Sequence, residues 1–335
     1  MVKMEALESI GEELPRWAPY LDDMDVRLTV YCRQMVEDDP ELHNVWEVLG
    51  VKRFFSLLNR YELRKDAVVR FVNLYEQLKF NGMSGRQRYK LTPVQVFQFA
   101  NILGFFMPDG SRLTRDAIIF VPRKFGKTTG VASLAFYDLL FGDSNGQAYM
   151  AANSKEQSGL CFKESKAIVK QFDPDGKRFR VTSDEISWKD NNLGKESLIS
   201  RLSSGGKTKD GLNASLVIFD EYAASRYVRD HSDGAELLNV LTSSMGTRKD
   251  PLTVIITTAS RINMGPFEIL LNSSKEALLA GDDDRQFLSC FQPDPWDIDA
   301  EDFGNPVVWK KCNPHLGITV RPDFYELEWN RARRD

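Results

Sequence analysis

The sequence predicts an α/β fold, in which a mostly parallel sheet is flanked by helices and preceded by a helical N-terminal region. Two observations lead to this prediction. From Leu91 onward, short apolar runs rich in β-branched residues alternate with helical stretches, as in a parallel sheet with helices on both faces. Residues 1–85 instead carry charged and apolar residues at helical spacing, without strand alternation.

Three regions follow from this pattern. A helical N-terminal region covers residues 1–85 and ends near the interruption NGMSGRQRYK. The α/β core covers residues 86–262. Residues 263–335 form a C-terminal extension that loosens into Asp- and Pro-rich sequence and stops inside an expected helix carrying RARR. We therefore expect the extension to be a linker toward a further domain.

Four apolar runs are expected to be buried parallel strands, because each is short and bounded by polar or turn residues. They are DAIIFVP (116–122), GQAYMAA (146–152), ASLVIFD (214–220) and LTVIITT (252–258). Between the second and the third, the alternation in residues 178–204 predicts antiparallel strands or a hairpin rather than another strand–helix unit.

Composition narrows the class of protein. A formal net charge of −4 over 335 residues excludes a protein coated with basic residues, so a nucleic-acid role needs a local basic surface. The four cysteines are dispersed and only three histidines occur, which argues against structural zinc and for a reducing compartment. Because no apolar run approaches membrane-spanning length and the N-terminus lacks a signal core, we expect a cytoplasmic protein without a membrane partner.

The stretch IIFVPRKFGKTTGVASL contains a candidate phosphate-binding loop. It approaches G-x-x-x-x-G-K-[ST], although Val121 stands where the first glycine is expected. Lys127 would reach the β- and γ-phosphates, and the Thr128 hydroxyl would bind Mg²⁺. The expected nucleotide-binding residues of the loop are Pro122, Arg123, Lys124, Gly126, Lys127, Thr128 and Thr129. Gly-Lys at a helix start is common by chance, but here a strand precedes it and an amphipathic helix follows.

Two carboxylates follow the expected strand LVIF. Asp220 would hold Mg²⁺, and Glu221 would orient and deprotonate the attacking water. A DE pair after a strand is often only a solvated turn. Its position about 90 residues after the phosphate loop favours a nucleotide triphosphatase.

Two further segments have both a functional and a purely structural interpretation. Thr257 and Thr258 end the strand TVIITT and would sense the γ-phosphate, although a Thr-rich strand end is also favoured by β-propensity alone. Gln95 lies about 30 residues before the loop and would pair with the adenine edge. The same residue completes a capping box with Thr92, and both interpretations stay open.

In this order, the motifs resemble the large subunit of tailed-bacteriophage terminases, specifically its N-terminal packaging ATPase. The similar segments are LTPVQ, VPRKFGKTT, AYMAANSKEQ, KDGLNASLVIFDE, TTAS and WKKCNPHLGITV. Val121 is typical of one subgroup of that family. Val94 departs from it, because a tryptophan is common before the glutamine. Residues 1–70 match no family segment that we recognise.

The resemblance implies a P-loop NTPase of the ASCE, RecA-like class, using ATP and Mg²⁺. It implies a motor that translocates double-stranded DNA into a procapsid through the portal, with a small terminase subunit as partner, in the host cytoplasm. By position, Lys127, Thr128, Asp220, Glu221 and Gln95 keep the roles given above. Thr257 and Thr258 match the coupling motif. The protein is expected to form a homo-oligomeric ring when assembled and can be a monomer in isolation.

The resemblance also implies catalytic arginines. Arg123 matches a Walker A arginine that stabilises the γ-phosphate. No arginine lies between residues 202 and 225, where some relatives place a finger for the neighbouring subunit. Arg201, Lys207 and Lys209 are the substitutes, and Arg201 is the one we select.

Large terminases usually continue into an RNase H-like nuclease, whose metal-binding carboxylates we do not find here. The acidic runs GDDDRQ (281–286) and PDPWDIDAED (293–302) are expected to be solvated linker, so nuclease activity is expected only in the full-length protein.

Two other classes of protein stay open as alternatives to a packaging ATPase. A RecA-like helicase should show a second RecA-like domain, and a nucleotide-gated DNA-binding switch without turnover should lack the carboxylate at Glu221.

Overall fold

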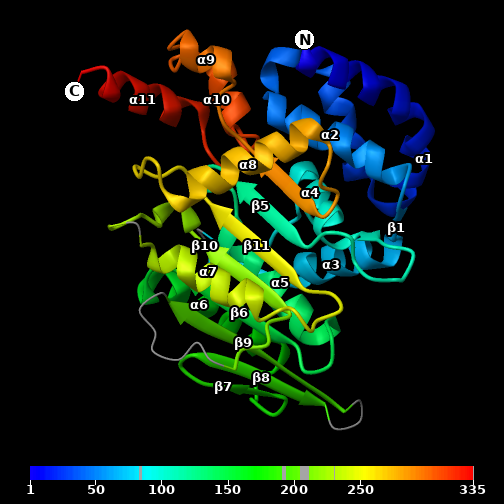
Figure 1. Cartoon of the computed structure of the whole chain (residues 1–335), viewed down its shortest axis with the longest axis vertical. Helices are drawn as coiled ribbons and strands as arrows, with labels where there is room; N and C mark the ends of the chain where they lie inside the picture. Colours follow the sequence, from blue (N-terminus) through cyan, green and yellow to red (C-terminus); the bar gives the residue numbers. More distant parts are fainter. Residues whose placement is uncertain (83–84, 191–193, 204–210, 230, 335) are drawn as a thin grey trace.

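The computed structural model describes residues 1–82, 85–190, 194–203, 211–229 and 231–334. Within these residues, eight strands form one sheet in the order β12-β5-β11-β10-β6-β9-β8-β7, flanked by helices (Figure 1). Its strands are β5 (Asp116–Phe120), β6 (Gln147–Ala152), β7 (Phe179–Val181), β8 (Glu185–Asp190), β9 (Lys195–Ser203), β10 (Leu216–Asp220), β11 (Leu252–Thr257) and β12 (Gln286–Cys290). The predicted α/β class with a mostly parallel sheet is confirmed.

Six neighbouring strands of this sheet, from β12 to β9, are parallel. All five residues of β10 and all six of β11 are buried, which explains why these strands appear as unbroken apolar runs. The segment predicted to be an antiparallel hairpin forms β7, β8 and β9, which pair antiparallel with one another. β9 also pairs parallel with β6, so the hairpin extends the main sheet.

Helices lie between and after these strands along the chain. They are α5 (Lys127–Phe141), α6 (Lys155–Phe172), the 3₁₀ helix η2 (Tyr222–Ala224), α7 (Asp233–Ser243) and α8 (Pro266–Ala280). The Ser154 hydroxyl accepts the Gln157 N–H and so caps the start of α6. Residues 130–136 of α5, including Val131 and Leu134, are all buried, because the helix packs against both the sheet and other helices.

The N-terminal region is mainly helical and lies at the β12 end of the sheet (Figure 1). Its helices are α1 (Val2–Glu37), η1 (Pro40–Leu42), α2 (Val45–Leu58) and α3 (Lys65–Gln77), and α4 (Pro93–Leu103), the first helix beyond residue 85, packs against α1 and α3. Helix α1 contains two prolines and kinks at Asp25, whose φ and ψ are −162° and 116°. The sequence pattern did not predict the short strands here, in which β1 (Glu62–Leu63) pairs with β4 (Phe105–Phe106) and β2 (Lys79–Gly82) pairs with β3 (Gly85–Arg88).

The sheet continues beyond residue 262, where we expected the core to end. After α8 the chain returns as β12, which pairs parallel with β5 at the end of the sheet. The extension then contains α9 (Pro295–Asp299), α10 (Pro306–Cys312) and α11 (Pro322–Ala332). The three domain boundaries themselves stay predictions.

One expectation about the acidic runs is wrong. Asp294 and Asp297, expected to be solvated, are buried with exposed fractions of 0% and 8%. Both pair with the wholly buried ammonium group of Lys311, at 3.2 and 2.9 Å. Glu41 of η1 contacts the same ammonium group at 3.1 Å. This buried ionic cluster joins the C-terminal extension to the N-terminal helices, and a buried charge needs such partners.

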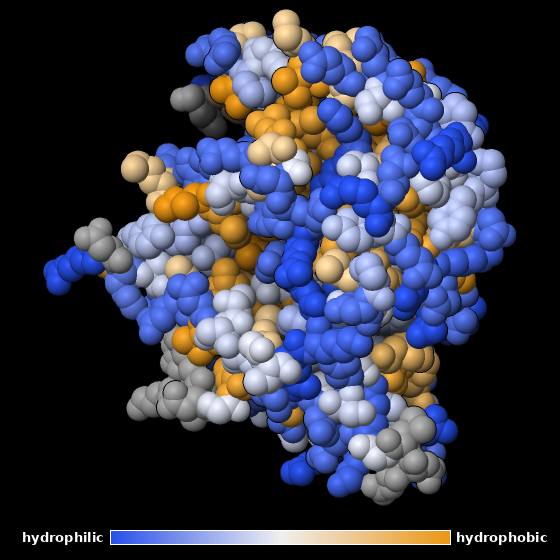
Figure 2. Space-filling view, turned by 45° about the vertical axis from the view of Figure 1, so that its right-hand side comes forward, coloured by the Kyte–Doolittle hydropathy of each residue, from blue (hydrophilic) through white to orange (hydrophobic). Residues whose placement is uncertain are grey.

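On the face shown in Figure 2, most exposed residues are hydrophilic and the hydrophobic ones gather in small separate patches. In the described part of the chain, no helix combines the length and the apolar character needed to cross a bilayer.

Candidate nucleotide site

Three loops meet at the carboxyl-terminal edge of the sheet. Strand β5 leads into the loop before α5, β10 ends at Asp220, and β11 ends at Thr257. Because β11 lies between β5 and β10 and all three strands are parallel, these loops emerge side by side. Ligands of open α/β sheets bind at this edge.

The loop before α5 has the backbone of a phosphate cradle. Gly126 and Lys124 have left-handed φ angles of 95° and 69°. A Cβ atom on Gly126 would also lie 3.1 Å from Nε2 of Gln95, so conformation and space both favour glycine. Gly126 is the N-cap of α5, which puts the positive end of the helix dipole at the loop. Val121 is buried, and its N–H donates to the carbonyl of Thr257, so it continues the pairing with β11.

The other predicted residues of the loop differ in exposure. Arg123, Lys124 and Thr128 are exposed, and Pro122 is half-buried. Thr129 donates from its hydroxyl to the Gly126 carbonyl at 2.9 Å, which closes the first turn of α5. Arg123 makes no hydrogen bond or ion pair with any residue in the described ranges. Its guanidinium group is therefore available to an anion.

Lys127 reaches both carboxylates of the DE pair. Its ammonium group forms an ion pair with Oε1 of Glu221 and lies 3.9 Å from Oδ1 of Asp220. Burial raises the pKa of Asp220, and the charge of Lys127 only partly opposes this effect. Burial also acts to raise the pKa of Glu221, but the hydrogen bond and charge of Lys127 outweigh it and lower that pKa overall.

The hydroxyl groups of Thr257 and Thr258 point to the carboxylate of Glu221. The second carboxylate oxygen of Glu221, Oε2, accepts the Thr258 hydroxyl at 3.1 Å and the Thr258 N–H at 3.3 Å. The Thr257 hydroxyl lies 3.4 Å from the same oxygen and also accepts the Ala223 N–H. The predicted coupling residues therefore touch the predicted catalytic base directly.

Gln95 forms the capping box that its sequence context predicts. Its Oε1 accepts the Thr92 N–H at 3.0 Å, and its Nε2 donates to the Phe125 carbonyl at 3.0 Å. The side chain therefore links the start of α4 to the phosphate loop. Contact with adenine would require one of these bonds to be exchanged, and that role stays a prediction.

Arg201 lies on β9, which is separated from β10 by β6. Its guanidinium group is paired with Asp184 at 2.5 Å within the same chain. The structure therefore does not bring Arg201 to Lys127 and Glu221. The alternatives Lys207 and Lys209 lie outside the described residues.

The sequence pattern missed three residues beside the site. Cys161 on α6 donates from its thiol to Oδ2 of Asp220 at 3.0 Å. Asn153 donates from Nδ2 to the Glu221 carbonyl at 3.0 Å, supporting the left-handed φ of 55° at Glu221. His315, far along the chain, stacks on Phe125 of the loop with ring centroids 4.3 Å apart. Asn153 follows a predicted strand end, which is a usable signal, but no local pattern indicates the other two.

The donor set fits a Mg²⁺-bound nucleoside triphosphate. A glycine cradle at a helix N-terminus and a lysine suit phosphate groups. The buried carboxylate of Asp220 and the hydroxyl of Thr128, an exposed residue, supply the oxygen ligands that Mg²⁺ prefers. In this structure, the anionic partners of the Lys127 ammonium group are Glu221 and Asp220. A bound phosphate group can replace these carboxylates as its partner.

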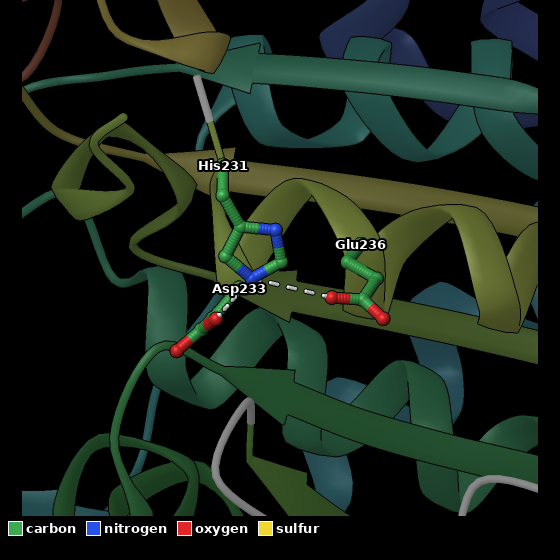
Figure 3. Close-up of side chains that lie close together, drawn as sticks. All are labelled: His231, Asp233 and Glu236. Atoms are coloured by element: carbon green, nitrogen blue, oxygen red, sulfur yellow. Dashed lines mark hydrogen bonds and ion pairs between the residues drawn. The ribbon is translucent and has the colours of Figure 1, made fainter. Parts of the chain in front are cut away.

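A separate polar group lies at the start of α7. The imidazole of His231 lies between the carboxylates of Asp233 and Glu236, with its Nε2 2.7 and 3.5 Å from them (Figure 3). All three residues are exposed. Acidic residues in a first helical turn stabilise the helix dipole, which accounts for the arrangement without a metal ion.

Comparison with known proteins identifies the family. The sequence profile of the terminase large subunit ATPase domain matches residues 93–276, more than half of the chain. None of the curated proteins compared matches the chain.

Solved structures of phage terminases resemble the chain. The large terminase of bacteriophage HK97 superposes with a TM-score of 0.64 at 22% identity, covering 80% of this chain and 52% of that one. The large terminase of a thermophilic bacteriophage, in complex with ADP, gives 0.38 at 16% identity over 53% and 40%. The ATPase domain of the Thermus phage P74-26 enzyme gives 0.35 at 18% over 44% and 61%.

The chain thus spans about half the length of the HK97 protein, with which it shares its fold. The profile match covers the phosphate loop, the DE pair and the Thr-Thr strand end that the fold brings together. The chain belongs to the family of terminase large subunit ATPase domains.

Proposed function

We propose that this protein is the Mg²⁺-dependent ATPase motor that translocates double-stranded viral DNA into a procapsid through the portal. The observation that carries the proposal is the contact of Lys127 with Glu221, which Thr258 holds from the other side. This arrangement links a phosphate-binding lysine, a candidate catalytic base and a strand-end hydroxyl. Assembly into a homo-oligomeric ring, a small terminase subunit and a location in the host cytoplasm belong to the same proposal.

The residues divide the chemistry between them. Lys127, Arg123 and the N–H groups of the loop bind the phosphates and neutralise their charge. Thr128 and Asp220 would hold Mg²⁺, which offsets charge on the β- and γ-phosphates. Gln95 would contact the base.

Glu221 is the group that acts on water. When phosphate takes the place of Glu221 as the partner of Lys127, the carboxylate becomes free to accept a proton from water. The water oxygen then bonds to the γ-phosphorus as the bond to the bridging oxygen of ADP breaks. A carboxylate at this position favours turnover over a nucleotide-gated switch.

The test compares Glu221→Gln with Lys127→Ala. Glu221→Gln should keep Mg·ATP binding and lose turnover by about 10²–10⁴-fold, because the glutamate acts only in the chemical step. Lys127→Ala should lose both, because the lysine neutralises phosphate charge in the bound state. Glu236→Gln, an exposed carboxylate of α7, is the matched control.

Hydrolysis and DNA movement are measured in parallel, the second with portal and procapsid supplied. Near-normal turnover by Glu221→Gln would remove it as the catalytic base. ATP hydrolysis that never moves duplex DNA would contradict the motor itself.

A further inference from the structure

A cysteine thiol contacts the carboxylate that we assign to Mg²⁺. Cys161 is 1% exposed, and its Sγ donates to Oδ2 of Asp220 at 3.0 Å. Helix α6 begins directly after β6, capped by Ser154, and packs on β6 and β10. The helix therefore carries the thiol to the end of β10 on a rigid element.

The two oxygens of Asp220 have different partners. Oδ2 accepts the thiol, whereas Oδ1 is the oxygen 3.9 Å from the Lys127 ammonium group. Thr128, the other assigned metal ligand, is a further polar neighbour of the same thiol. One side chain thus borders both assigned Mg²⁺ ligands, and it holds the carboxylate in one orientation.

We propose that Cys161 is a positioning residue for the divalent metal ion of the bound nucleotide. By occupying Oδ2, the thiol presents Oδ1 as the single oxygen available on the Lys127 side. Mg²⁺ demands near-octahedral geometry and is usually bound through one or two carboxylates, so a carboxylate free to rotate would bind it less well. A thiol is a weak donor, which orients Asp220 without strongly reducing the charge that the metal needs.

The inference rests on the proposed nucleotide site, and the experiment separates the two. The affinity for ADP is measured by titration calorimetry in EDTA and again with Mg²⁺, and the ratio is the metal contribution. Cys161→Ala should reduce this ratio about tenfold, at the lower end for residues that orient a metal ligand. Its affinity for ADP in EDTA should change less than twofold.

Two variants make the readout specific. Cys161→Ser keeps a donor at the same position and should restore the metal contribution. Cys32→Ala empties a comparable volume at a fully buried cysteine of α1 and should leave both affinities unchanged. A purely structural role for Cys161 would weaken ADP binding equally with and without Mg²⁺.

Three results would overturn the inference. The first is a normal metal contribution in Cys161→Ala, and the second is a Cys161→Ser protein as impaired as the Ala protein. The third is a wild-type protein that binds ADP without any Mg²⁺ contribution, whereas a wild-type protein that binds no nucleotide contradicts the proposed function itself. If Cys161→Ala does not fold, Cys161→Val restores volume without a donor and is judged by the same ratio.

Discussion

At the scale of residues, the site is organised around one glutamate. Glu221 has a left-handed backbone, its N–H donates to Ile256, and its carbonyl accepts from Asn153. Its carboxylate has Lys127 on one oxygen and the hydroxyl of Thr258 on the other. The contacts with Lys127 and Thr258 lower the pKa of the Glu221 carboxylate and fix its orientation. Removal of either contact should therefore change that pKa.

Thr258→Val should change the pH dependence of hydrolysis more than nucleotide binding. Loss of a donor to the ionised carboxylate raises the pKa of Glu221. Because the base is active when ionised, the acidic limb of the kcat profile should move to higher pH. Nucleotide affinity should stay within about threefold, since the phosphate ligands are untouched, and less DNA should be moved per ATP.

The matched control is Thr253→Val on the same strand. The hydroxyl of Thr253 contacts the sulfur of Met245 instead of the site. If both variants show the same acidic limb and the same DNA movement per ATP, the contact between Thr258 and Glu221 has no part in catalysis or coupling.

At the scale of elements, the sequence predicted the strands that carry the site and missed one that borders it. β5, β6, β10 and β11 were predictable because buried parallel strands form unbroken apolar runs between turn residues. β12 has the short run QFLSC behind an acidic turn, which periodicity cannot separate from a loop or a helix fragment. The pairing of β9 with β6 could not be predicted either, because the residue pattern of a strand does not indicate which strand it pairs with.

The site shows the same division. Motif spacing indicated Lys127, Asp220 and Glu221, because a phosphate loop and a strand-end carboxylate have local signatures. The contacts of Cys161 and His315 arise from packing between segments far apart in the chain. Motifs also could not show that the Thr258 hydroxyl meets Glu221.

The C-terminal extension should make stability depend on pH through His315. Burial lowers the pKa of His315 from 6.5 to about 4, and the nearby Lys310 adds to this. Between pH 6.5 and 4, His315 is therefore neutral in the folded protein, whereas it is protonated in the unfolded chain. Its contribution is fully present above pH 6.5 and is lost as the pH falls toward 4, amounting to about 3 kcal/mol.

Urea unfolding at several pH values checks this dependence. His315→Phe keeps a ring against Phe125 but cannot titrate, so its free energy of unfolding should fall less between pH 6.5 and 4 than that of the wild type. His43 has the opposite sign, because Glu47 and Asp38 raise its pKa against the effect of burial. It is present in both proteins and cancels in the comparison. Parallel curves for the two proteins would contradict the assignment.

At the scale of the whole molecule, no arginine in the described part of the chain forms a hydrogen bond or ion pair with the carboxylate of Glu221. The assigned candidate, Arg201, is held by Asp184. In the proposed ring, a neighbouring subunit would supply this cation, and such a residue adds about 10³–10⁵ in rate to related phosphoryl transfers. The isolated chain should therefore hydrolyse ATP slowly and speed up on assembly.

Assemblies of two variant proteins test whether Arg201 acts at the site of the neighbouring subunit. Lys127→Ala and Arg201→Ala proteins should each be inactive, and their mixture should regain part of the activity, because one type of interface then carries both residues. Asp184→Asn, which frees Arg201 from its ion pair, should not lower the assembled rate. Full activity of Arg201→Ala alone, with no gain on mixing, excludes Arg201 as the finger.

The position of β12 also governs the order in which the molecule can be made. Strand β5 pairs with both β11 and β12, and Phe120 is paired with Cys290, about 170 positions later. At about 5–20 residues per second, the ribosome needs about 10–30 s to supply that partner. Strand β11 can cover one edge of β5 once residue 257 has been made, but the other edge stays open until β12 follows, and an open edge invites wrong pairing. Accurate folding of this domain therefore depends on keeping that edge of β5 shielded until the chain has passed residue 290.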